Sequence, residues 1–161
     1  MFPVDIQSLA TDSIRRLISR GHTLATAESC TGGLIAAALT EVPGASKAFR
    51  YGWVTYCHEA KMQELHVPEE LLKIHTVVSE PVVDAMATAA RAKARADFAL
   101  AVSGNAGPTA AEGEPPVGTV CLALATPSCT HATTLFRPGL SRHDFRMMVV
   151  REALLLFLNQ S

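Results

Sequence analysis

The sequence lacks any continuous apolar run long enough to cross a membrane, and its start, MFPVDIQSLA, has no basic segment followed by a hydrophobic one. Cysteine is scarce as well. Cys30, Cys57, Cys121 and Cys129 form no CxxC pair and no dense framework of the kind that small secreted domains use. We therefore expect a cytoplasmic protein with reduced thiols, no membrane association and no metal site.

An excess of positive charge is also missing. The chain has 14 Lys and Arg against 15 Asp and Glu, for a formal net charge of −1. Nonspecific binding to nucleic acid relies on many clustered cations, so we expect no nucleic-acid partner. The hydrophobic fraction of 48% and charged fraction of 18% are typical of a globular protein. A length of 161 residues suits one domain, which we expect to span residues 1–161.

Helical and strand patterns alternate along the chain. Short runs rich in apolar residues predict strands at 23–27, 48–56, 97–104, 119–125 and 130–136. Periodicity and capping signals predict helices at 6–18, 31–39, 59–65, from 69, 80–95 and 142–158. The order predicts an α/β domain with helices on both sides of a sheet. The last two strands follow each other directly, so we expect them to form an antiparallel hairpin in a mixed sheet.

The stretch ATAESCTGGLIAAAL gathers small polar residues and glycine between a predicted strand and a predicted helix. Ser29 lies near the helix N-terminus, where N–H groups without partners can hold a phosphate or an oxyanion. Gly32 and Gly33 leave that backbone open to a ligand. The alternative is that Ser29 or Thr31 only caps the helix. The stretch matches neither GxSxG nor GxxxxGK[ST], so generic motifs leave both interpretations open.

Lys61 is a candidate base for a serine nucleophile, because burial can lower the pKa of a lysine enough to populate the neutral amine. It follows Tyr56 by five residues in TYCHEAK, so one helical turn could bring it back to the edge of the sheet that carries the Tyr56 hydroxyl. The alternative is a solvated helix lysine paired with Glu59 or Glu64.

Two further segments could contact a ligand. Ser103 to Pro108 places two glycines at a strand end, where backbone amides can surround a ligand, although any sharp turn uses the same residues. Arg142 and Arg146 lie four residues apart at the start of the last predicted helix and could bind a phosphate together. Pairing with Asp144 or Glu152 is the structural alternative.

Five segments in fixed order resemble the C-terminal domain of the competence/damage-inducible protein CinA, a family that includes stand-alone nicotinamide mononucleotide deamidases. The segments are TAESCTGG (26–33), VTYCHEAK (54–61), VVSEPVV (77–83), AVSGNAGP (101–108) and PPVGTV (115–120). The resemblance implies a three-layer α/β/α sandwich with a mixed, mostly parallel sheet. It also implies hydrolysis of nicotinamide mononucleotide to nicotinate mononucleotide and ammonia, in pyridine nucleotide salvage.

The resemblance also implies roles for individual residues. Ser29 matches the family's nucleophile, Lys61 its base and Tyr56 the tyrosine beside them. Amide hydrolysis through an acyl-enzyme needs an activated hydroxyl, N–H donors for the oxyanion and an acid for the departing ammonia. The donors would come from Thr31, Gly32 and Gly33. The ribose and phosphate of the mononucleotide substrate would contact Arg142 and the loop of Gly104, Asn105, Ala106 and Gly107. No cofactor is implied, and we expect a homo-oligomer, with a dimer as its simplest form.

The sequence departs from the family pattern in the loops that would face the substrate. Asn105 and TAAEGEPP replace an apolar residue and a glycine-rich stretch, TYSNEAK becomes TYCHEAK, and the usual GDR before the last helix reads Leu140-Ser141-Arg142. A second hypothesis follows, in which the chain is a nucleotide-binding or protein-interaction domain with weak or no turnover. The two hypotheses differ in geometry, because an enzyme requires the Ser29 hydroxyl and the Lys61 amine to lie within hydrogen-bond reach beside an open pocket.

Overall fold

The computed structural model describes residues 1–160 as alternating helices and strands. In chain order they are α1 (Val4–Arg20), β1 (Leu24–Glu28), α2 (Leu34–Thr40), the short 3₁₀ helix η1 (Ala45–Lys47), β2 (Phe49–Val54), α3 (His58–Leu65), α4 (Glu69–His75), α5 (Glu80–Ala94), β3 (Phe98–Gly104), β4 (Thr119–Ala125), β5 (Thr130–Phe136) and α6 (Arg142–Gln160).

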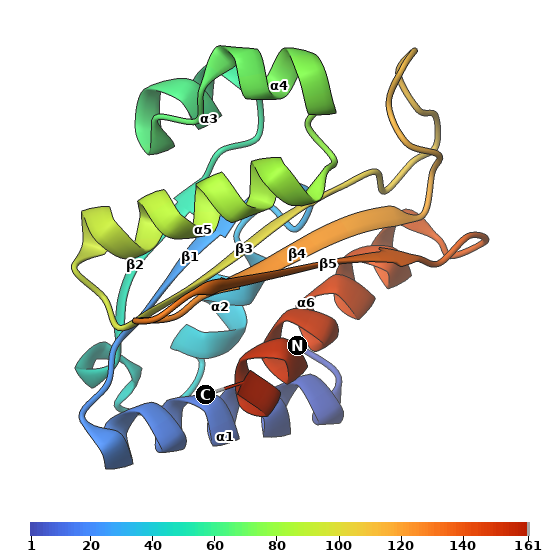
Figure 1. Ribbon diagram of the computed structural model, residues 1–161. Coiled ribbons are helices and arrows are strands. Elements are labelled where there is room, and N and C mark those ends of the chain that lie inside the picture. Colours follow the sequence, from blue (N-terminus) through green and yellow to red (C-terminus); the bar gives the residue numbers. More distant parts are fainter. Residues whose placement is uncertain (161) are drawn as a thin grey trace.

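The five strands form one mixed sheet in the order β2-β1-β3-β4-β5. β1 pairs in parallel with β2 and β3, whereas β4 runs antiparallel to both β3 and β5. The predicted hairpin is therefore confirmed. α5 covers one face of the sheet, and α1, α2 and α6 cover the other (Figure 1). This is the predicted three-layer α/β fold. Three neighbouring strands of the sheet, β2, β1 and β3, run parallel to one another.

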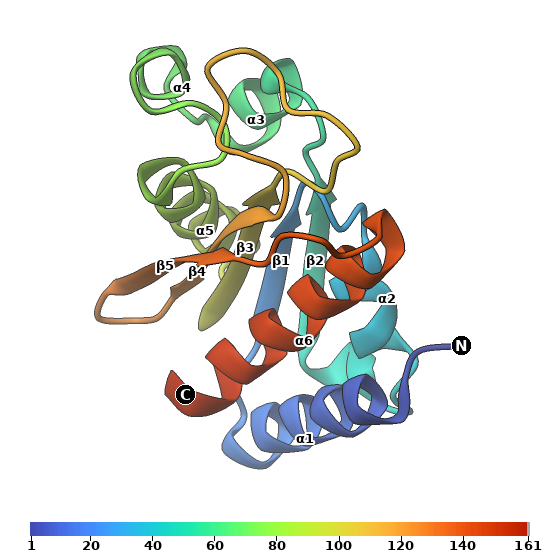
Figure 2. The same ribbon diagram turned by 90° about the vertical axis from the view of Figure 1, so that its right-hand side faces the viewer.

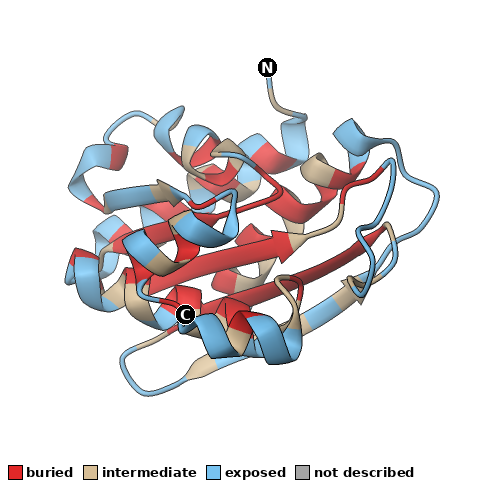
Figure 3. Cartoon of the chain, turned by 90° about the horizontal axis from the view of Figure 1, so that it is seen from above, coloured by how far each residue is buried: buried red, intermediate tan, exposed pale blue. Residues whose placement is uncertain are grey.

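Side-chain size differs between the two faces of the sheet. Toward α1 and α6, the central strands present large residues such as Leu24, Leu100 and Leu122. Toward α5 they present mainly alanine, and alanines of α5, including Ala87 and Ala90, pack against them. Because strand side chains alternate between faces, one strand serves both layers. β1 and β4 are buried at every residue (Figure 3), which accounts for the continuous apolar runs seen in the sequence.

The start of α2 differs from the sequence-based expectation, whereas α5 begins at Glu80 as predicted. α2 begins at Leu34 rather than at residue 31, because Gly32 and Gly33 have φ values of 61° and 92° and turn the chain before the helix begins. Ser79 directly precedes α5, but its hydroxyl makes no cap to that helix. It donates instead to the carbonyl of Thr76 at 3.0 Å, within the turn that precedes the helix.

Candidate active site

The carboxyl end of β1 is the point at which the chain reverses its direction across the sheet. From β1 the chain passes through α2 to β2 on one side, and then through α3, α4 and α5 to β3 on the other side. Ligands of open α/β sheets bind at such switch points. Ser29 directly follows β1, and its N–H donates to the Val102 carbonyl at 3.1 Å. Figure 2 shows α3, α4 and the loop after β3 gathered above this end of the sheet.

The last residue of β1, Glu28, holds the turn that carries Ser29. Its side chain is fully buried. Oε2 accepts hydrogen bonds from the Thr31 hydroxyl at 2.7 Å and from the N–H groups of Gly33 and Ile35 at 3.0 Å, and Oε1 accepts from the Ala36 N–H at 2.8 Å. A carboxylate in this position satisfies free helix donors and is favoured by the helix dipole. The anion at the N-terminus of α2 is therefore the protein's own.

Two of the three backbone donors expected from Thr31, Gly32 and Gly33 are engaged within the protein. The Gly33 N–H is bound to Glu28, and the Gly32 N–H donates to the Ser29 carbonyl at 2.9 Å. None of the three lines the cavity beside Ser29. The two glycines instead allow the tight turn through which the Glu28 side chain reaches the start of α2.

Arg146 of α6 fastens the same turn from the other side. Its Nε donates to the Cys30 carbonyl at 3.1 Å and its Nη2 to the Thr31 carbonyl at 2.7 Å. The predicted joint binding of a phosphate by Arg142 and Arg146 is therefore wrong, since the Arg146 guanidinium is engaged with backbone carbonyls. Its role here is to hold the backbone of the turn that directly follows Ser29.

Lys61 meets Ser29 at the floor of the site. Its Nζ lies 3.1 Å from the Ser29 hydroxyl oxygen and donates to the Thr55 carbonyl at 2.7 Å. The side chain is only 1% exposed, which excludes the alternative of a solvated lysine paired with Glu59 or Glu64. Burial lowers the pKa of Lys61 from 10.5 to about 8, because desolvation disfavours the charged amine. A neutral amine is therefore accessible at mildly basic pH.

The position of Lys61 follows from how α3 begins. The Thr55 N–H donates to the Glu28 carbonyl at 2.9 Å, which keeps the chain after β2 beside the chain after β1. Cys57 then caps α3, its Sγ accepting from the Ala60 N–H at 3.4 Å. One helical turn later Lys61 points back at the sheet. Ser29 directly follows β1, and Lys61 lies in the helix that follows the neighbouring parallel strand β2.

A cavity of about 270 Å³ opens beside these two side chains. Of the residues predicted for the site, those that line it are Ser29, Tyr56, Lys61, Gly104, Asn105, Ala106, Gly107 and Arg142. The geometric condition set by the sequence is met, because the hydroxyl and the amine lie within hydrogen-bond reach beside an open pocket.

Arg142, at the start of α6, joins two sides of the cavity. Its Nη1 donates to the Gly107 carbonyl at 2.5 Å, and its Nη2 donates to the Tyr56 hydroxyl at 2.7 Å. Tyr56 is 57% exposed, so this contact lies at the rim rather than at the floor. The guanidinium is the cationic group of the rim and can meet an anionic part of a ligand there.

Hydrogen bonds of Asn105 hold the long loop after β3 in place. Its side-chain Nδ2 donates to the Pro115 carbonyl at 3.2 Å, and its Oδ1 accepts from the Gly107 N–H at 3.1 Å. The Asn105 N–H donates to the Thr119 carbonyl at 2.8 Å. The amides of Asn105 and Gly107 therefore have partners inside the protein, and the loop presents its surface to the cavity as a rigid wall.

Ser103, the first residue of the predicted ligand-contacting segment, also lines the cavity, together with residues that the sequence did not single out as site residues: Cys30, His58, Val77, Val78 and Thr109. Burial, and next the charge of Glu28, raise the pKa of the Cys30 thiol to about 12, so this thiol is unreactive at neutral pH. Val77 and Val78 form the apolar part of the lining. An apolar pair before a helix is an ordinary packing signal, so nothing local in the sequence could have identified them.

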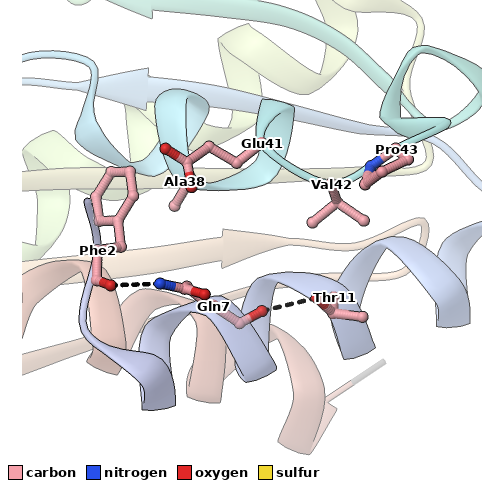
Figure 4. A pocket seen from close by; sticks show the side chains of 7 residues that line it. All are labelled: Phe2, Gln7, Thr11, Ala38, Glu41, Val42 and Pro43. Carbon is pink, nitrogen blue, oxygen red and sulfur yellow. Dashed lines mark hydrogen bonds between the residues drawn. The ribbon is translucent and has the colours of Figure 1, made fainter.

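A second, smaller cavity of about 110 Å³ lies between α1 and α2, lined by Phe2, Gln7, Thr11, Ala38, Glu41, Val42 and Pro43 (Figure 4). Two of its polar side chains bond to the backbone of α1 and the segment before it: Gln7 Nε2 donates to the Phe2 carbonyl, and the Thr11 hydroxyl donates to the Gln7 carbonyl. It has no nucleophile paired with a base. Over residues 1–160, no cluster of three or more metal-binding side chains occurs and no helix is suited to crossing a membrane.

Known proteins are similar to this chain in sequence and in fold. The CinA C-terminal domain family matches residues 6–160. A CinA-like protein of Akkermansia muciniphila is 53% identical over 91% of this chain, which spans only 36% of that relative. The chain thus covers about a third of the length of such CinA-like relatives. Nicotinamide-nucleotide amidohydrolase PncC of Escherichia coli is 48% identical, and the match covers 76% of this chain and 74% of PncC.

Solved structures agree with the sequence relatives. A crystal structure of the competence/damage-inducible protein CihA from Agrobacterium tumefaciens superimposes with a TM-score of 0.94 at 41% identity, covering 99% of both chains. A CinA superfamily protein from Escherichia coli superimposes with a TM-score of 0.91 at 35% identity, covering 98% of this chain and 93% of the other. The chain belongs to the CinA C-terminal domain family.

Proposed function

We propose that this protein hydrolyses the carboxamide of nicotinamide mononucleotide, giving nicotinate mononucleotide and ammonia for pyridine nucleotide salvage. The observation that carries the proposal is the buried Lys61 amine, 3.1 Å from the Ser29 hydroxyl at the floor of an open cavity. A serine is a weak nucleophile unless a base beside it accepts its proton. The relationship to PncC, which is named for this reaction, supports the choice of substrate.

In the first half of the proposed reaction, Ser29 attacks the carboxamide carbon. The neutral amine of Lys61 takes the hydroxyl proton as the new C–O bond forms, while the Thr55 carbonyl holds the amine in place. The N–H of Cys30, next to the nucleophile, is the backbone donor that we assign to the oxyanion. Lys61 then returns the proton to the leaving nitrogen, the C–N bond breaks and ammonia departs.

The second half of the reaction releases the product. The acyl group is now an ester of the Ser29 hydroxyl. Lys61, neutral again, accepts a proton from a water molecule that attacks the ester carbonyl. The ester C–O bond breaks, the proton returns to the serine oxygen, and nicotinate mononucleotide leaves as a carboxylate. One residue therefore serves as base and acid in both halves, which a pKa near neutrality favours.

The phosphate of the substrate is assigned to the rim of the cavity. Arg142 provides the positive charge there, and it also contacts Tyr56 and Gly107. Gly104, Asn105 and Ala106 continue the wall along which the ribose would lie. With Ser29 at the floor and Arg142 at the rim, the carboxamide and the phosphate occupy opposite ends of the cavity.

The competing function is a nucleotide-binding or protein-interaction domain without turnover. The altered loops at Asn105 and Leu140 motivate it. The Ser29–Lys61 contact favours the enzyme, because a buried lysine beside a serine destabilises the fold and serves no purpose in a domain that only binds.

The experiment is to incubate the purified protein with nicotinamide mononucleotide and measure ammonia and nicotinate mononucleotide together. We expect equal amounts of the two products, and a loss of roughly a thousandfold or more in kcat for Ser29→Ala and Lys61→Ala. Ser46→Ala and Lys47→Ala, which change exposed residues, are the controls and should keep full activity. A folded wild-type protein that releases no ammonia would leave the binding domain as the function.

A further inference from the structure

Glu114 lies in the loop after β3 and carries an unexplained buried oxygen. Its Oε1 accepts a hydrogen bond from the Val77 N–H at 3.2 Å. Its Oε2 is shielded from solvent, and within residues 1–160 it has no hydrogen-bond partner. A buried carboxylate oxygen without a partner is costly, so its presence in a native structure requires an explanation.

The first part of the explanation is the segment that Glu114 holds. Thr76 has φ 63° and ψ 167°, a strained backbone conformation for a β-branched residue, which persists only where its surroundings fix it. Val77, the next residue, is held at both polar groups: its N–H by Glu114, and its carbonyl by the Ser103 hydroxyl at 2.6 Å. Val77 and Val78 are the apolar lining of the cavity, so Glu114 fixes the surface against which an aromatic ring would pack.

The second part is electrostatic. Desolvation lowers the pKa of Lys61, and three ionisable groups oppose it: Cys30 from the turn after β1, Cys57 at the start of α3, and then the carboxylate of Glu114. Cys30 in turn is influenced by Glu28 and Arg146, and the ionisable residues across the cavity are Tyr56, His58 and Arg142. Glu114 is the carboxylate that acts on Lys61 directly.

We propose that Glu114 is a positioning residue of this site: one carboxylate oxygen fixes the Val77–Val78 wall, and its negative charge keeps the Lys61 amine available as an acid as well as a base. The proposal rests on the function proposed above. Glu114 acts through Val77 and Lys61 without touching the reacting atoms.

Two substitutions separate the two roles. Glu114→Gln keeps an acceptor for the Val77 N–H but removes the charge, so the pKa of Lys61 should fall further. The acidic limb of the kcat/KM profile should then move to lower pH by roughly half a pH unit, with KM nearly unchanged. Glu114→Ala removes the acceptor as well, and should add a rise in KM of roughly tenfold because the valine wall is released. Glu112→Gln, in the same loop but exposed, is the control and should change neither quantity.

A second readout does not depend on turnover. The Cε resonance of Lys61, assigned with Lys61→Arg, reports the titration of the amine by NMR in the wild type and in Glu114→Gln. Equal midpoints in the two proteins, or an equal shift in Glu112→Gln, would overturn the electrostatic role, and an unchanged KM in Glu114→Ala would overturn the wall. If the wild type does not hydrolyse nicotinamide mononucleotide, the proposed function fails. The NMR titration still shows whether the charge of Glu114 affects the titration of the Lys61 amine.

Discussion

Replacing Lys61 with methionine should stabilise the protein at neutral pH while abolishing its proposed activity. Lys61 is buried, and its pKa in the folded protein is lowered from 10.5 to about 8 by desolvation. The charged amine is therefore penalised on folding by roughly 3 kcal/mol. Methionine fills a similar volume without a charge, but it leaves the Thr55 carbonyl and the Ser29 hydroxyl without a partner, at a cost of roughly 1 kcal/mol each. The net gain at pH 7 is about 1 kcal/mol.

The stability difference between the wild type and Lys61→Met should depend on pH. Below about pH 8 the amine is charged in the folded and the unfolded protein, so the wild type carries the whole penalty. Between about 8 and 10.5 the unfolded state binds more protons than the folded state, so the stability of the wild type rises with pH. Above 10.5 the penalty is gone. From pH 7 to pH 10 the wild type should gain roughly 2 kcal/mol relative to Lys61→Met.

Urea unfolding of both proteins at several pH values is the assay, because other titrating groups cancel in the difference between them. Lys47→Met, an exposed substitution in η1, is the control and should show no trend with pH relative to the wild type. A difference between wild type and Lys61→Met that stays constant from pH 7 to pH 10 would refute the lowered pKa. A loss of more than about 2 kcal/mol in the variant at pH 7 would refute the desolvation penalty itself.

Three other substitutions test separate parts of the structure. Glu28→Gln should lower the free energy of unfolding by roughly 3 kcal/mol, measured by urea unfolding. The four donors that bond to the Glu28 carboxylate lose a charged acceptor, and one of them would face the side-chain N–H of the glutamine. The control is Glu41→Gln, an exposed substitution at the far end of α2, which should change the free energy of unfolding little. Arg95→Gly should raise the melting temperature, corresponding to about 1 kcal/mol, because the exposed Arg95 ends α5 at φ 49°. Arg142→Ala should raise KM for nicotinamide mononucleotide by roughly tenfold or more and leave KM for nicotinamide riboside, which lacks the phosphate, nearly unchanged.

The fold was largely predictable because local signals and burial agree along most of the chain. The strands Thr119–Ala125 and Thr130–Phe136 have the predicted bounds, since one is a continuous apolar run and both are delimited by glycine or proline turns. Disagreement arose where a side chain distant from the helix supplies the cap. No local pattern indicates that the side chain of Glu28, the last residue of a buried strand, accepts hydrogen bonds from the start of α2. The sequence therefore offers no means of seeing that the donors near residues 31–33 are already engaged.

The candidate site was less predictable from spacing than from resemblance. Nothing in the separation of Ser29 and Lys61 requires them to meet, and spacing alone favours a solvated Lys61 over a buried one. Their contact depends on the parallel pairing of β1 with β2, which is a tertiary property. The Val77–Val78 wall and the carboxylate of Glu114 are missing from the sequence-based site for the same reason, because a strained turn and a long loop from distant segments bring them together.

Covalent attachment of the substrate to Ser29 is the most direct test of the central claim. The protein is quenched in acid during turnover of nicotinamide mononucleotide, digested and analysed by mass spectrometry. We expect the peptide containing Ser29 to gain the mass of the nicotinate mononucleotide acyl group. This adduct should be absent from Ser29→Ala, which should also release no ammonia above background. An adduct on a different residue, or ammonia release by Ser29→Ala within about tenfold of the wild type, would contradict a serine nucleophile at this site.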